Sequence, residues 1–70
     1  MENKNELKIT TRDRLLSAWQ NSTELVRDFQ NYSDDIRDSQ CIKKMFAEFA
    51  EDEAVHSAKL LEYLHEYEGK

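Results

Sequence analysis

Residues 46–60 read FAEFAEDEAVHSAKL, a stretch whose apolar spacing is typical of an amphipathic helix. Apolar residues recur at helical spacing within it and on both sides of it, on a row formed by Ile42, Met45, Phe46, Phe49, Leu60, Leu64 and Tyr67. Residues seven positions apart lie on the same side of a helix, and this spacing adds two polar residues, Glu53 and His56, to the row. The pattern predicts a long amphipathic helix over about residues 39–67.

A second amphipathic stretch precedes this one. Its apolar stripe consists of Leu15, Ala18, Trp19, Leu25, Val26, Phe29, Tyr32 and Ile36, and the same stripe includes Ser22. Thr10 followed by Asp13 has the form of a helix N-cap with an acidic residue in the first turn. We therefore predict a helix over about residues 11–36.

The two predicted helices meet at a short polar connection. Residues 37–38 are the expected turn, with Asp38 as N-cap of the second helix and Ser39 as the alternative. A connection this short makes the helices antiparallel. The chain has no Pro and a single Gly at position 69, so one continuous helix remains the alternative. The expected class is all-α, with a flexible polar arm over 1–10 and a helical hairpin over 11–70.

A hairpin of this size lacks the usual means of stabilising a small domain. Seventy residues bury a modest core, and the lone Cys41 cannot form an internal disulfide. Two helices with one stripe each leave Trp19, Phe29, Phe46 and Phe49 partly exposed. We therefore expect pairing with a second copy into a homodimeric four-helix bundle. A different, ligand-complete protein is the alternative partner.

Composition limits the other partners. The chain has 15 acidic and 10 basic residues, a formal net charge of −5, which disfavours nucleic acid. No apolar run approaches the roughly 20 residues of a membrane span, and residues 1–8 lack a signal-peptide pattern. These features predict a cytoplasmic protein with neither nucleic acid nor membrane as its partner.

Glu53 and His56 are the candidate site residues. Their separation of three positions points both side chains to one side of a helix. Counting from the turn places Ser22 level with Glu53, and Trp19 near His56. A buried carboxylate has to be paired, hydrogen-bonded or coordinated to a metal ion. The two readings are therefore metal ligation and a buried acid–imidazole pair that fixes helix register.

Residues 46–60 resemble the second-helix signature of ferritin-like, rubrerythrin-type proteins. Less specific similarities lie at residues 15–19 and 36–38, and the likeness covers about residues 12–66. The resemblance implies non-haem iron or manganese held between two helix pairs, with Glu53 and His56 matching the Glu-x-x-His ligands. The family also places a glutamate on the first helix, where this chain has Gln20, Asn21 and Ser22.

Two functions follow from this comparison. The first is a ferritin-like, rubrerythrin-like homodimer that binds a divalent metal through Glu53 and His56, with a degenerate di-iron centre. The second is a non-catalytic helical interaction module in which the same residues form a buried polar pair. With one carboxylate per chain on the predicted buried row, we expect little or no iron oxidation and name no catalytic residue.

Overall fold

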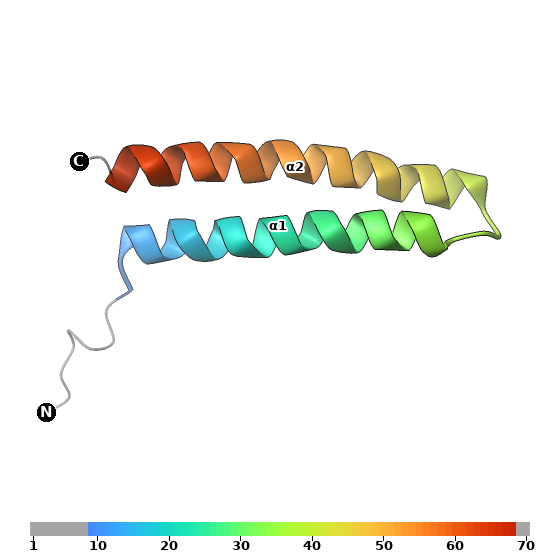
Figure 1. Cartoon of the computed structure of the whole chain (residues 1–70), viewed down its shortest axis with the longest axis horizontal. Coiled ribbons are helices and arrows are strands. Elements are labelled where there is room, and N and C mark those ends of the chain that lie inside the picture. The colour runs from blue at the N-terminus through green and yellow to red at the C-terminus, as the bar shows by residue number, and fades with distance from the viewer. Residues whose placement is uncertain (1–8, 69–70) are drawn as a thin grey trace, which may run out of the picture.

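The computed structural model describes residues 9–68, which form two antiparallel α-helices. Helix α1 spans Thr11–Asp35 and helix α2 spans Gln40–Glu68, and the start of α1 and the end of α2, here called the chain ends, lie at the same end of the pair (Figure 1). The predicted all-α helical hairpin is confirmed, and the alternative of one continuous helix is wrong. The polar arm was predicted over residues 1–10, and its first eight residues lie outside the described part.

Helix α1 begins with a capping box. The Thr10 hydroxyl accepts a hydrogen bond from the Asp13 backbone N–H at 3.0 Å, and the Asp13 carboxylate accepts one from the Thr10 N–H at 3.2 Å. These bonds satisfy two backbone donors that a helix start leaves without partners. At the same end of the hairpin, the Arg12 guanidinium pairs with the Glu68 carboxylate at 2.7 Å and joins the two helices.

The connection covers residues 36–39, and Ser39 rather than Asp38 caps α2. The Ser39 hydroxyl accepts a hydrogen bond from the Ile42 N–H at 3.2 Å. Lys43 stabilises the other side of the connection, because its Nζ donates to the Ser33 carbonyl at 2.7 Å. This places a cation at the C-terminal end of α1, where the helix dipole favours positive charge.

The contact between the helices, here called the seam, is lined with small side chains. Its buried residues are Ser22, Ser33, Ala50, Ser57 and Leu64. Small residues at a contact let helix backbones approach closely. Larger side chains flank the seam at the turn end, where Phe29, Tyr32, Phe46 and Phe49 pack with ring centroids 5.3–6.4 Å apart.

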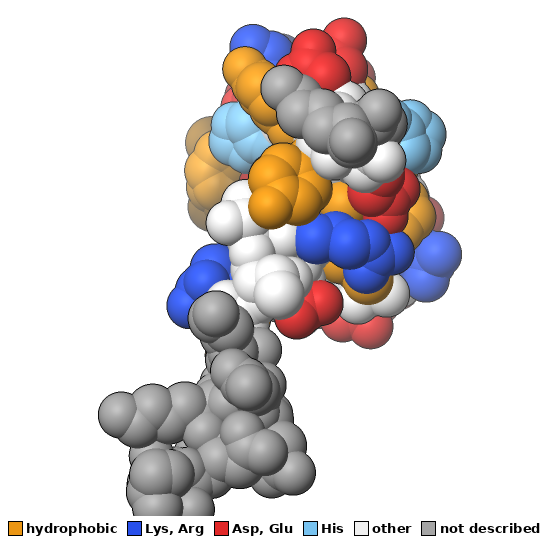
Figure 2. Space-filling view, turned by 90° about the vertical axis from the view of Figure 1, so that its left-hand side faces the viewer, with side chains coloured by type: hydrophobic (Ala, Val, Ile, Leu, Met, Phe, Trp, Pro, Cys, Tyr) orange, Lys and Arg blue, Asp and Glu red, His pale blue; other side chains and the backbone are white. Residues whose placement is uncertain are grey.

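The hairpin is a single layer of helices. Its Cα atoms extend over only 12 Å along the shortest axis, and no large side chain among residues 9–68 is fully buried. Viewed end-on, hydrophobic side chains reach the surface between charged groups (Figure 2). A stable domain ordinarily packs two layers around a core. Over the described residues, the hairpin therefore has a seam but no core of large apolar side chains.

One side of this layer carries a row of exposed, mostly apolar residues from each helix and is called the open face. It is formed by residues 18, 25 and 32 of α1 and by residues 42, 49, 56 and 63 of α2, each set spaced by seven positions. Its exposed members are Leu25, Tyr32, Ile42, Phe49, His56 and Tyr63. Neither helix of the described part has an apolar stretch suited to crossing a bilayer.

Candidate functional site

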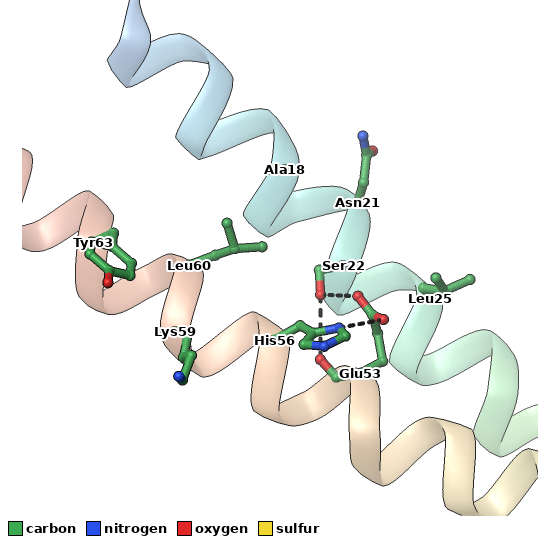
Figure 3. Close-up of a pocket in the computed structure, with 9 residues that line it drawn as sticks. All are labelled: Ala18, Asn21, Ser22, Leu25, Glu53, His56, Lys59, Leu60 and Tyr63. Carbon is green, nitrogen blue, oxygen red and sulfur yellow. Dashed lines mark hydrogen bonds and ion pairs between the residues drawn. The ribbon is translucent and has the colours of Figure 1, made fainter.

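The candidate site is a chain of hydrogen bonds that joins the two helices through Glu53. The Ser22 hydroxyl donates to Glu53 Oε2 at 2.5 Å, and His56 Nδ1 lies 3.2 Å from Glu53 Oε1 (Figure 3). Ser57 lies one turn along α2, and its hydroxyl is 2.6 Å from that of Ser22. Each carboxylate oxygen of Glu53 therefore has a defined partner.

The Ser22 hydroxyl is the main influence on the charge of Glu53. Its hydrogen bond lowers the pKa of the Glu53 carboxyl from the ordinary value of 4.5. Partial burial acts in the opposite direction, and the neighbouring His56 adds a smaller lowering through its hydrogen bond and charge. Glu53 is thus a carboxylate at neutral pH.

Glu53 and His56 line an open groove of about 490 Å³ on the open face. The groove residues are Ala18, Asn21, Ser22, Leu25, Glu53, His56, Lys59, Leu60 and Tyr63 (Figure 3). The site lies near the middle of the hairpin, because the central residues of α1 and α2 are Thr23 and Ala54. The hydrogen-bonded pair is therefore presented at mid-length rather than at an end.

Glu53 and His56 were both predicted to lie on a buried row, and this prediction is wrong for His56 in the single hairpin. The α2 row that enters the seam is Ala50, Ser57 and Leu64, so the row through His56 lies on the open face. The His56 side chain is 65% exposed in the hairpin, whereas that of Glu53 is 19% exposed. In a single hairpin, only Glu53 of the pair is substantially buried.

Of the two α1 residues predicted to lie beside the site, the structure places one there. Ser22 lies level with Glu53 as predicted, and the two are hydrogen-bonded. Trp19 was expected near His56, but Ala18 is the α1 residue that lines the groove there. The 100° rotation between successive helical residues puts Trp19 toward the other side of the seam.

Ser57, Lys59 and Tyr63 are groove or network residues that sequence reasoning did not assign to the site. Ser57 is four positions beyond Glu53, and its position on a helix-facing row was the available signal. Lys59 and Tyr63 line the groove three and seven positions beyond His56. The same helical spacing that selected His56 would have selected both.

The arrangement differs from a nucleophilic triad. In a Ser-His-acid triad the imidazole lies between the hydroxyl and the carboxylate. Here the carboxylate of Glu53 lies between Ser22 and His56. Ser22 is buried and its hydroxyl donates a hydrogen bond to a carboxylate, so no imidazole is placed to activate it.

A single hairpin does not fit a di-iron centre. Among residues 9–68, no three His, Cys, Asp or Glu side chains are grouped closely enough to hold a metal ion. At the level of Glu53, α1 contributes the hydroxyl of Ser22 rather than a carboxylate. One chain offers two candidate ligands, fewer than the three or four protein ligands of typical zinc sites.

No protein-family model, curated protein or solved structure matches this chain.

Proposed function

We propose that the protein is a self-associating helical module, in which two hairpins join through their open faces into a four-helix bundle. The single-layer architecture carries this proposal, because a second layer supplies the core that one hairpin lacks. A cytoplasmic location remains a prediction from the sequence. The resemblance to ferritin-like proteins agrees with the proposed architecture, since that family carries its metal between two such helix pairs.

The open face exposes aromatic side chains that supply a large part of such an interface. Tyr32, Phe49 and Tyr63 are 49%, 43% and 60% exposed, which amounts to roughly 300 Å² for side chains of about 200 Å² each. Leu25 and Ile42 extend the same surface. A standard interface buries about 800 Å² per partner, so these three rings alone supply more than a third of that area.

A matched pair of substitutions tests the proposed interface. Tyr63 on the open face and Val55 on another side of α2 are 60% and 58% exposed. We expect Tyr63→Asp to yield monomers in analytical ultracentrifugation, because a buried charge at the interface is unfavourable. Val55→Asp should keep the mass of the unmodified protein. Equal masses for the two variants would contradict the proposed interface.

Divalent metal binding is the second candidate function. Because Glu53 and His56 lie near mid-length, a two-fold axis through the centre of the interface brings the pairs of both copies to the same level. The dimer would then offer two carboxylates and two imidazoles, a donor set suited to iron, manganese or zinc. No step of catalysis is assigned to these residues, and we expect no ferrous-iron oxidation above that in buffer.

Thermal unfolding with excess Fe²⁺, Mn²⁺ or Zn²⁺ tests this second function. A metal that binds only the folded state raises the melting temperature. We expect His56→Ala to lose the increase and His65→Ala, which changes the other histidine, to keep it. An increase that survives His56→Ala, or none in the unmodified protein, would exclude the site at Glu53 and His56.

A further inference from the structure

We infer that the two hairpins of the proposed dimer stack head to tail, with the turn of each beside the chain ends of the other. This inference rests on the proposed function. In the dimer, the groove of each copy is filled by the aromatic end of the other copy. It follows from differences in shape and charge between the two halves of the open face.

The half nearer the turn is crowded. It holds Tyr32 and Phe49, which pack with Phe29 and Phe46 beside the seam at ring-centroid distances of 5.3–6.4 Å. Phe49 and Tyr32 remain 43% and 49% exposed, so this aromatic cluster presents rings to a partner.

The half nearer the chain ends is hollow. The 490 Å³ groove extends from Leu25 and Glu53 toward Ala18 and Tyr63, and the short side chains of Ala18 and Ser22 leave room at its floor (Figure 3). The apolar residues Leu25 and Leu60 give it walls suited to an aromatic ring.

Two symmetric arrangements can place the open faces together. A two-fold axis along the helices puts both turns at one end, so that cluster meets cluster and groove meets groove. A two-fold axis across the helices, parallel to the open face, lays each cluster over the partner's groove. Because protein interiors are close-packed with few voids, the second arrangement is favoured.

The charges along α1 favour the same arrangement. Asn21 lines the groove, and the sevenfold row through it consists of Arg14, Asn21, Asp28 and Asp35. This row is positively charged near the chain ends and negatively charged near the turn. Head-to-tail stacking lays α1 antiparallel on α1 of the partner, so Arg14 lies opposite the partner's Asp28 and Asp35.

A spin label on Cys41 allows the distance between the two copies to be measured. It is the only cysteine of the chain and is exposed in the first turn of α2, 13 positions before the central residue Ala54. At about 1.5 Å per residue, a nitroxide label on Cys41 lies roughly 20 Å from the centre along the helix. Head-to-tail stacking therefore separates two labels by about 40 Å. With both turns at one end, the separation is about 20 Å or less, because helices pack 8–10 Å apart.

Double electron–electron resonance on labelled protein, with its mass measured on the same sample, distinguishes these outcomes. A dimer with labels about 40 Å apart supports head-to-tail stacking. A dimer with labels about 20 Å apart overturns the stacking and leaves the proposed dimer intact, whereas a monomeric mass overturns both. As a control, Ala54→Cys in a Cys41→Ser background puts the labels at mid-length, where both arrangements give a short distance.

Discussion

At the scale of single residues, Ser22 decides the geometry of the site. The sequence predicted its level from the length of the turn, and a serine on an otherwise apolar stripe was a visible departure. It could not predict that the hydroxyl would lie 2.5 Å from one Glu53 oxygen and 2.6 Å from the Ser57 hydroxyl, because side-chain contacts across a seam depend on helix rotation as well as on level. Ser22 thus fixes the Glu53 carboxylate against α1.

Substituting Ser22 measures this role. We expect Ser22→Ala to lower the free energy of unfolding by about 2 kcal/mol at pH 7, because it removes a hydrogen bond to a carboxylate and one to a buried hydroxyl. Ser17→Ala, an exposed serine of the same helix, should change it little. Urea unfolding at one fixed protein concentration makes the comparison, and equal effects of the two substitutions would contradict it.

The cost of Ser22→Ala should also depend on pH. The folded-state pKa of Glu53 lies below its ordinary value of 4.5, so the unfolded chain takes up the proton more readily. The stabilisation is therefore complete well above pH 4.5 and is lost as the pH falls through the folded-state pKa. Repeating the urea experiment from pH 7 to pH 3 should show the difference shrinking toward the part that Ser57 contributes. A difference that grows on acidification would be the wrong sign.

At the scale of the elements, the apolar stripes predicted both helices but not which residues meet. Each stripe is wide enough to serve a seam and an open face together. The α2 seam uses Ala50, Ser57 and Leu64, whereas the neighbouring row through Phe49, His56 and Tyr63 remains on the surface. The row with small residues forms the seam, since small side chains allow the closest backbone approach. A hydrophobicity pattern gives small residues little weight, so it did not identify this row.

The N-cap of α2 gives a test at this scale. Asp38 and Ser39 are both favoured cap residues, so sequence alone could not separate them, whereas the Ser39 hydroxyl is the one that accepts from the Ile42 N–H. We expect Ser39→Ala to cost about 1 kcal/mol of stability and Asp38→Ala much less. Thermal unfolding of the two variants distinguishes them, and a larger loss for Asp38→Ala would assign the cap to Asp38.

At the scale of the whole molecule, the hairpin could be predicted from the sequence, whereas its pairing with a partner is still an inference. Helical spacing and a short polar connection are local features, and both were readable from residues 10–67. Assembly depends on a surface that one chain exposes and another covers. The exposed rings of Tyr32, Phe49 and Tyr63 define where that covering is needed, and the position of Glu53 and His56 near mid-length places the candidate site within it.

The mass of the unmodified protein in solution tests whether two hairpins pair through their open faces. Sedimentation equilibrium over a range of concentrations should give twice the chain mass of 8.3 kDa, with the open faces covering each other. A folded helical chain that sediments at 8.3 kDa at every concentration would contradict the claim, because its open face would then be exposed to water.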